Sequence, residues 1–499
     1  MKLAGTSRLD PDTLAPPGRR WGAHLLLFAI VAALGFGAAV LTAVFPLIGV
    51  GAASGLVLMI AVVRVPEILL VLFVFSLGVP IQLNLGGLPV NATDGVLILW
   101  LVATPFILLR RGSMAWQMPF GVKAIIPFAA AVLLSLILAS DPPGQYKQFM
   151  RVAEWFIILP LALSIFPPDG RTLRFVGFLL LVAPCVFAID GIVEMLNNGN
   201  SISRMLGIPV PTPEDTSRET IHHTYDVSGR AGSTFGGAQG LAFFLAIFLS
   251  ISMAHLVRAP SRALRVTAAC SAVICVGGLV AAQSRGGYIG AGAAAFAIAA
   301  LEFQALRRLA VLGGGMILAA GVLVLATWPG WDGTVVELVP GSRVEGVVDR
   351  LAIWQTALSV WRDHPWFGVG LSNFRDHALN YKIDLLVPLG YESFHAHSTY
   401  IEILVDTGLV GLVSYACFLV VTFVGLLRSW RMARHDRRLH RGTFAMAAIG
   451  ALVTYLVFAS VDMLLLQNLH MMLVLFLYFG LLRGEVGKAD AQARREATA

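Results

Sequence analysis

Long apolar runs constrain the fold of this chain more than any other feature. A transmembrane helix needs about 20 predominantly apolar residues, and the 499-residue sequence contains fourteen candidate runs. Hydrophobic residues make up 57% of the chain and charged residues only 13%, which excludes an ordinary soluble protein. The sequence therefore predicts an all-α polytopic membrane protein with about 12–14 transmembrane helices. The runs lie near residues 22–42, 43–63, 66–85, 94–109, 122–139, 152–166, 174–194, 236–257, 266–283, 287–304, 309–327, 398–426, 443–461 and 464–482.

Basic residues predict how the chain is oriented. The short loop before the run at 443–461 is rich in arginine, and short loops this basic stay on the cytoplasmic side. This orientation places residues 1–21 and 483–499 in the cytoplasm as tails and makes 22–482 the membrane domain. Two long polar segments, 195–235 and 328–397, then fall on the outer face. The arginines of the basic loop are Arg428, Arg431, Arg434, Arg437, Arg438 and Arg441.

Net charge and cysteine content exclude two other classes. A net charge of +7 and a pI of 9.4 would fit a nucleic-acid-binding protein, but the basic residues follow the predicted inner loops. We therefore expect contacts with membrane lipids and no nucleic acid partner. The apolar run after Arg19-Arg20 continues directly into a second one, so no cleavable signal peptide is expected. The four cysteines all lie in apolar runs, which argues against a disulfide framework.

One segment of the second polar loop has helical spacing. Ile353, Trp354, Ala357 and Trp361 recur on one helical face, and the pattern ends at His364-Pro365. This predicts an amphipathic helix near the outer leaflet, with its tryptophans at the depth of the lipid headgroups.

Two outer-face arginines are candidates for anion binding. Arg230 ends the first polar loop just before a span, and Arg285 lies in a tight turn between two spans. An arginine at the rim of a helix bundle is costly to desolvate unless it finds an anion, and neighbouring glycines let backbone amides approach that anion as well. Guanidinium geometry suits a diphosphate better than an ammonium does. Each arginine could instead anchor the chain to lipid headgroups.

A histidine at the start of an apolar run is the candidate for acid–base chemistry. His397 can accept a proton near neutral pH, as activation of a hydroxyl requires. His395 lies two residues earlier and could be a hydrogen-bonding neighbour. Glu402 and Asp406 are four residues apart on the predicted helix and share one face, where buried carboxylates need partners. One of them could orient a loop arginine, and an interhelical hydrogen bond is an equally good explanation.

These motifs together resemble the O-antigen ligase and polymerase family of bacterial membrane glycosyltransferases. The resemblance is discontinuous, and its blocks occur in the family's order on one predicted face. Gly408 and Gly411, which belong to the histidine block, would most simply allow close helix packing. The blocks are Arg230-Ala231-Gly232-Ser233-Thr234-Phe235, Ser284-Arg285-Gly286, Arg350 followed by Trp354, His364-Pro365, Gly368-Val369-Gly370, and His397-Ser398 followed after nine residues by Gly408 and then Gly411.

The resemblance implies a GT-C-like fold, a location in the inner membrane and a specific reaction. A glycan would pass from a polyprenyl-diphosphate carrier to an acceptor hydroxyl on the lipid A core or on another glycan, at the periplasmic face. Arg230 and Arg285 would bind the diphosphate, and His397 would assist the hydroxyl, with Arg350, His395 and Glu402 in supporting positions. The carrier is already a good leaving group, so we expect neither a cofactor nor a metal.

Two alternatives remain open at the level of sequence. Fourteen predicted spans exceed the dozen or so usual for ligases of this family, which keeps a polysaccharide polymerase in consideration. A lipid-linked glycan flippase would also be basic and polytopic, but transporters tend to show repeated halves and a site near the midplane. Here the polar residues concentrate on the outer face.

Overall fold

The structure is a computed structural model, and it describes the following residues: 46–78, 82–85, 88–111, 124–138, 153–163, 170–207, 230–235, 237–259, 261–309, 316, 345–371, 373–378, 396–434 and 440–461. The predicted tails at 1–21 and 483–499 lie outside these residues. The chain forms two compact units, one of Met1–Leu72 with Val96–Trp116 and one of Phe73–Gly95 with Gln117–Ala499.

The first unit contains α2 (Pro46–Arg64), most of α3 (Glu67–Ser76) and most of α4 (Ala92–Arg111). Arg110 donates from Nη1 to the carbonyl oxygens of Val63 (2.8 Å) and Arg64 (2.7 Å). These carbonyls end α2 and have no partner within that helix, so the guanidinium of α4 caps it.

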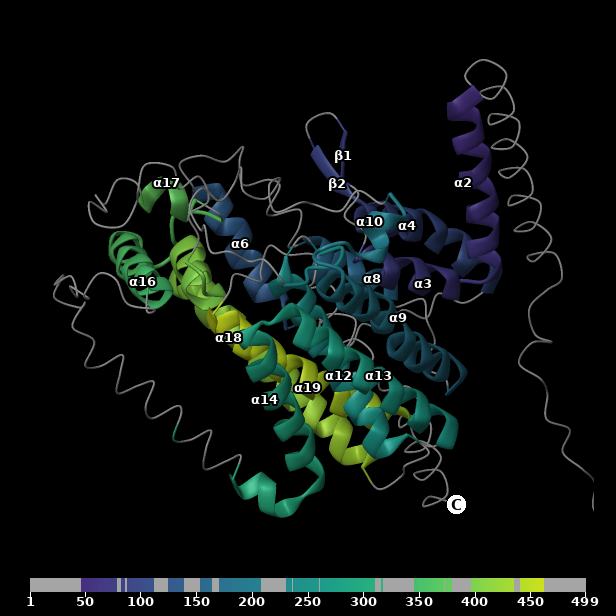
Figure 1. The fold of residues 1–499 in the computed structure, drawn as a ribbon. Coiled ribbons are helices and arrows are strands. Elements are labelled where there is room, and N and C mark those ends of the chain that lie inside the picture. The colour runs from purple at the N-terminus through teal and green to yellow at the C-terminus, as the bar shows by residue number, and fades with distance from the viewer. Residues whose placement is uncertain are drawn as a thin grey trace, which may run out of the picture. The chain divides into compact units, whose positions relative to one another are not determined.

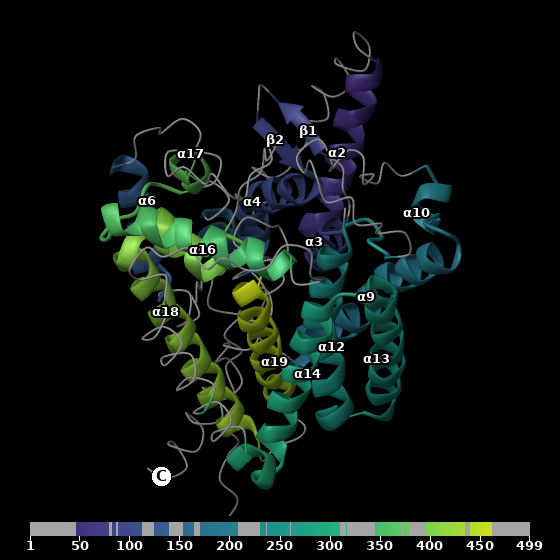
Figure 2. The same ribbon diagram turned by 60° about the vertical axis from the view of Figure 1, so that its left-hand side comes forward.

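The second unit is a helix bundle with a small hairpin (Figures 1 and 2). At its centre α12 packs against α9, α13, α14 and α19, and α18 packs against α19 and α6. The shorter α16 lies across the N-terminal part of α18 (Figure 2). Its elements are β1 (Gln82–Leu85), β2 (Leu88–Asn91), α6 (Ile126–Leu138), the π-helix η2 (Glu154–Ile158), α8 (Leu159–Leu163), α9 (Gly170–Leu196), α10 (Ile202–Met205), α12 (Ala238–Arg258), α13 (Arg262–Ala282), α14 (Arg285–Glu302), α16 (Glu345–Asp363), α17 (Phe374–Ala378), α18 (Thr399–Ala433) and α19 (His440–Val461).

Six of the described helices are long and apolar enough to cross a membrane. They are α4, α9, α12, α13, α18 and α19, and each covers a run that the sequence predicts. The prediction of a helical, multi-pass membrane protein is therefore confirmed. The antiparallel pair β1–β2, with Gln82 opposite Asn91, was not predicted. β1 occupies the end of the run predicted at 66–85, whose helix α3 ends at Ser76, and β2 lies between that run and the next.

One buried arginine joins the C-terminal ends of three helices of this bundle. Arg258, 3% exposed at the end of α12, forms an ion pair with Glu302 (Nη1 to Oε1, 2.8 Å) at the end of α14. Its Nη2 donates to the carbonyl oxygens of Ala433 (3.4 Å) and Arg434 (2.5 Å) at the end of α18. The C-terminal ends of α12, α14 and α18 therefore lie together, and α14 and α18 run in the same direction.

Candidate functional site

The turn between α13 and α14 places Arg285 at the start of a helix. Gln283 ends α13 in the left-handed region (φ 48°), and Ser284 caps α14 by accepting a hydrogen bond from the Gly287 amide (3.3 Å). Arg285 is the first residue of α14, and its side chain is exposed. The sharp reversal at Gln283 thus leaves a guanidinium at the N-terminal end of the helix, where the backbone dipole already favours an anion.

Arg230 is held beside this same turn. The amide of Ala231 donates to the carbonyl oxygen of Ala281 (3.0 Å), and Nε of Arg230 donates to that of Ala282 (3.4 Å). The end of the first polar loop is therefore bonded to the last residues of α13, and Arg230 and Arg285 lie at one corner of the bundle. We call this place, Arg230–Phe235 with Ala281–Gly287, the arginine corner. Neither guanidinium forms an ion pair with a residue that the structure describes.

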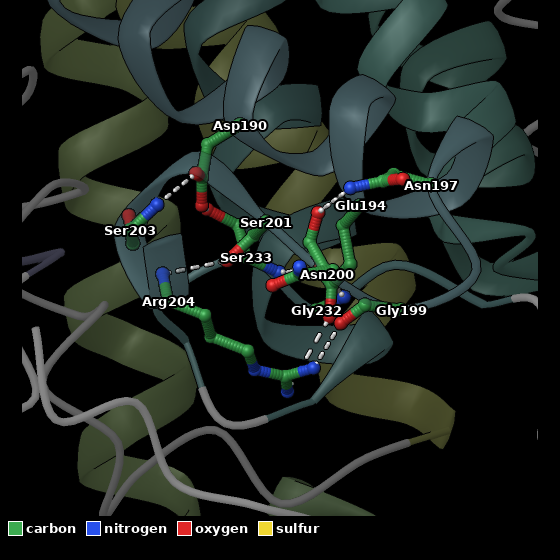
Figure 3. A network of polar contacts seen from close by, with 10 residues as sticks. All are labelled: Asp190, Glu194, Asn197, Gly199, Asn200, Ser201, Ser203, Arg204, Gly232 and Ser233. Atoms are coloured by element: carbon green, nitrogen blue, oxygen red, sulfur yellow. Dashed lines mark hydrogen bonds and ion pairs between the residues drawn. The ribbon is translucent and has the colours of Figure 1, made fainter. Parts of the chain in front are cut away.

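Two carboxylates of α9 anchor the loop that carries Arg230 (Figure 3). Glu194 accepts hydrogen bonds at Oε2 from the amides of Gly232 (3.0 Å) and Ser233 (2.7 Å). Asp190 accepts at Oδ2 from the Ser233 hydroxyl (2.7 Å) and at Oδ1 from the amide of Ser203 (2.8 Å). Both acids are apparent in the sequence near the end of an apolar run, but nothing there identifies their partners.

These contacts change one expectation about the arginine corner. The sequence predicted that glycine amides beside the two arginines would cradle phosphate oxygens. In the structure the Gly232 amide is bound by Glu194 and the Gly287 amide by the Ser284 hydroxyl. These two amides are therefore not available to an anion, whereas the exposed guanidiniums are.

His397 lies at the start of α18 in a left-handed backbone conformation, with φ 47°. The preceding residue, Ala396, is held from both sides. Its amide donates to Oε2 of Glu402 (2.7 Å), and its carbonyl oxygen accepts from Nε1 of Trp354 in α16 (2.7 Å). Glu402, which the sequence placed in support of His397, thus contacts the backbone next to it. The His397 side chain is half-buried.

The helix α18 is broken at Gly408, which follows His397 in the chain. Gly408 has φ 67° and ψ −170° inside the helix, so the regular hydrogen bonds stop there. The segment 365–370 replaces them: Val369 and Gly370 donate to the carbonyls of Val405 and Asp406 (both 2.9 Å). In return, the amides of Leu409 and Val410 donate to the carbonyl oxygens of Pro365 (2.9 Å) and Trp366 (3.2 Å).

This exchange explains the glycines of the motif and corrects their expected role. A Cβ at Gly408 would overlap the carbonyl group of Trp366, and one at Gly368 would overlap the carbonyl of Val405. The two glycines therefore join a loop to a broken helix, whereas the sequence suggested packing between intact helices for Gly408. Non-helical backbone at membrane depth is tolerated where protein satisfies its polar groups. We call residues 354–370 with 396–410 the histidine corner.

The amphipathic helix predicted in the second polar loop is present as α16. Its apolar face packs into a protein cluster with Val369, Phe374, Ala396 and Val405. Trp361 donates from Nε1 to the carbonyl oxygen of Pro365 (3.1 Å). Trp354 and Trp361 thus both donate hydrogen bonds to backbone carbonyls within the histidine corner. The backbone of Arg350 lies in α16, while its side chain, like the whole of His395, lies outside the described residues.

The last turns of α19 lie between the two corners. Tyr400, one turn after His397, donates from its hydroxyl to the carbonyl oxygen of Leu456 (3.2 Å). On the other side, the Thr454 hydroxyl donates to the carbonyl of Gly290 in α14 (3.4 Å). Since α14 and α18 also run in the same direction, Arg285, which begins α14, and His397, which lies two residues before α18, are at the same end of the bundle.

A membrane-embedded helix bundle with a cationic corner and a histidine corner at one end is the class of protein that this geometry defines. Residues 270–416 match the family model described as O-antigen ligase, which confirms the family resemblance inferred from the motifs. The matched residues include Arg285 and the whole histidine corner, while Arg230 lies outside them.

A similar protein is the exopolysaccharide production protein ExoQ of Rhizobium meliloti (strain 1021), which is 28% identical over 134 residues. The alignment covers 26% of this chain and 30% of the relative. The chain thus matches less than a third of that protein's length, and its similarity is local.

Proposed function

We propose that this protein is a metal-independent membrane glycosyltransferase that moves a glycan from a polyprenyl-diphosphate carrier to an acceptor hydroxyl. The observation that carries this proposal is the placement of Arg230, Arg285 and His397 at one end of the bundle, around the last turns of α19. The local match to the O-antigen ligase model and the similarity to an exopolysaccharide production protein support the same class of reaction.

The proposed chemistry needs two functions from the protein. The acceptor oxygen attacks the anomeric carbon of the donor sugar, and the bond from that carbon to the diphosphate oxygen breaks. Arg230 and Arg285 bind the departing diphosphate, whose negative charge grows as the bond breaks. His397 takes the proton of the acceptor hydroxyl. Arg350 and His395 stay in supporting positions in this proposal, and Glu402 supports His397 by binding Ala396.

We further propose that this end of the bundle faces the periplasm in the inner membrane. The arginine-rich C-terminal end of α18 supports this orientation, because Arg428, Arg431 and Arg434 lie at the opposite end of that helix from His397. Membrane lipids and the lipid-linked donor would then surround the bundle, and the acceptor would arrive from the aqueous side.

The acceptor distinguishes a ligase from a polymerase, and we favour the ligase. The test is transfer of a labelled polyprenyl-diphosphate glycan by the purified protein, with lipid A core or a second lipid-linked repeat unit as acceptor. Labelled lipid A core supports the ligase, and lengthened lipid-linked glycan supports the polymerase. Movement of intact donor across vesicles without transfer to either acceptor would identify a flippase and refute the proposal. Activity that requires added divalent metal would refute its metal-independent form.

A further inference from the structure

The buried acid pair of α9 is the strongest polar feature that the proposed reaction does not use. Asp190 and Glu194 are only 4% and 5% exposed, and they lie four residues apart on one face of a helix long enough to span the membrane. Carboxylates in such a place are costly unless partners satisfy them. Their partners therefore indicate why they are present.

Three of the five polar contacts of these carboxylates are with the loop that carries Arg230. One Glu194 oxygen accepts from two successive amides, Gly232 and Ser233, and Asp190 accepts from the hydroxyl of Ser233. Ser233 is held at φ 50°, a conformation that costs a non-glycine residue energy and persists only where its surroundings fix it. Successive amides in such a turn form a concavity that commonly binds anions. Here the protein's own carboxylate occupies it.

We propose that Asp190 and Glu194 are positioning residues that hold Arg230 beside Arg285 and so set the spacing of the diphosphate site. Glu194 acts as a hydrogen-bond acceptor for the loop backbone, and its negative charge is not what the site requires. Phe235, at the end of the same loop, packs on Phe187 of α9 and Phe244 of α12 (ring centroids 5.3 and 4.7 Å). The loop is thus fixed at both ends. This inference rests on the proposed role of Arg230.

The structure offers a matched control for the charge of Glu194. Arg204 approaches the other carboxylate oxygen, with Nη2 3.5 Å from Oε1, and its Nη1 also donates to the carbonyl of Gly199. Among the residues drawn in Figure 3, Arg204 bonds to Ser201, Gly199 and Glu194 and not to the loop residues Gly232 and Ser233. Removing it changes the electrostatics of Glu194 and leaves the acceptor geometry at Oε2 intact.

The experiment compares Glu194→Ala, Glu194→Gln and Arg204→Ala in the full-length protein, with kcat and donor KM measured on labelled polyprenyl-diphosphate glycan. Glu194→Ala should raise the donor KM roughly tenfold, the loss expected for about 1.4 kcal/mol of binding. Glu194→Gln keeps an oxygen that can accept both amides and should restore the KM to within about twofold. Arg204→Ala should leave it near the value of the unmodified protein.

A double-mutant cycle separates positioning from general stability. In an Arg230→Ala background, Glu194→Ala should weaken donor binding no further, because the two residues act through one contact. Ser233→Ala, which removes only the hydroxyl bound by Asp190, provides a milder variant if Glu194→Ala does not fold. The donor KM of Ser233→Ala should rise about threefold. An unchanged donor KM in both Ser233→Ala and Glu194→Ala would overturn the inference.

Three further results would also decide the matter. Equal damage in Glu194→Gln and Glu194→Ala would show that the charge is required, which contradicts the acceptor role. Normal donor binding in Arg230→Ala would refute the proposed function itself. Loss of binding in Arg230→Ala with normal binding in Glu194→Ala would refute only the positioning role.

Discussion

The arginine corner and the histidine corner satisfy the hydrogen bonds of irregular backbone in different ways. Each holds irregular backbone at the end of a membrane bundle, where unsatisfied polar groups are costly. In the arginine corner, side-chain carboxylates of α9 accept the loop's hydrogen bonds. In the histidine corner, backbone pairs with backbone, as segment 365–370 fills the break of α18. The first corner therefore depends on side-chain acceptors, and the second on glycines that permit close approach.

Under the proposed function, this difference suits the two corners to separate tasks. The arginine corner presents cationic side chains that are exposed and suited to binding a charged ligand. The histidine corner fixes the backbone directly before a half-buried imidazole, which suits a group that must meet a hydroxyl in one orientation. Mutations in the first should therefore impair donor binding, and mutations in the second the chemical step.

The largest effect is expected from removing either arginine. Arg230→Ala and Arg285→Ala should each abolish transfer, because each removes a charge-assisted contact to the diphosphate. Lysine should restore little, since it lacks the planar pair of donors. Binding of a labelled polyprenyl-diphosphate glycan to the purified variants measures the loss, with membrane insertion as the control. Near-normal activity in both alanine variants would make these residues lipid anchors.

His397→Ala should impair the reaction in a different way. Loss of general-base assistance should lower kcat by roughly 10²–10⁴, while the arginines should keep donor affinity within a few-fold of normal. His395→Ala should cost much less, and a chelator should change neither result. Single-turnover transfer, with donor binding followed separately, measures both quantities. Lost donor binding in His397→Ala would remove the proposed division of tasks.

Gly408→Ala tests the backbone exchange of the histidine corner. A backbone with φ 67° and ψ −170° is adopted essentially by glycine alone and costs an alanine about 1–3 kcal/mol, and its Cβ would also overlap the Trp366 carbonyl. We expect a lower Tm and a loss of transfer smaller than that of His397→Ala. Gly292→Ala is the matched control, because a Cβ there, inside α14, meets nothing within 4 Å. Equal stability of the two variants would show that the break at Gly408 does not constrain the fold.

Sequence alone predicted the membrane helices well and the site only in outline. Apolar runs identify α12, α13, α18 and α19 because length and hydropathy suffice for a spanning helix. The motifs identified Arg285 and His397, but not the contacts that hold them. The Glu194 interaction with Gly232 and Ser233 joins residues far apart in the chain. No periodicity reports such a contact, and likewise none predicts that a loop replaces the hydrogen bonds broken at Gly408.

Trp354→Phe should have a smaller effect than these variants. It keeps the aromatic packing of α16 and removes the hydrogen bond from Nε1 to the Ala396 carbonyl. Such a bond contributes about 1 kcal/mol net, so we expect kcat to fall up to about tenfold with an unchanged donor KM. Trp361→Phe, which loses the bond to Pro365, acts farther from His397 and should lower kcat less. A raised donor KM in Trp354→Phe would contradict the separation of the two corners.

The smallest expected effect is a pH dependence of stability that comes from the pair His364 and His377. The rings of His364 and His377 lie 5.5 Å apart between centroids, and burial, then the charge of His364, lower the pKa of His377, with Asp376 opposing them. The unfolded chain then binds a proton more readily than the folded one below the ordinary histidine pKa of about 6.5. Stability from His377 is therefore complete above that pH and falls as the pH drops toward the lowered value.

Thermal unfolding between about pH 7.5 and pH 5.5 should show a Tm that falls less in His377→Gln than in the unmodified protein. Arg285→Gln is the control, because a guanidinium keeps its charge across this range, and it should retain the full pH dependence. An identical decline in all three proteins would place the pH sensitivity outside the histidine pair.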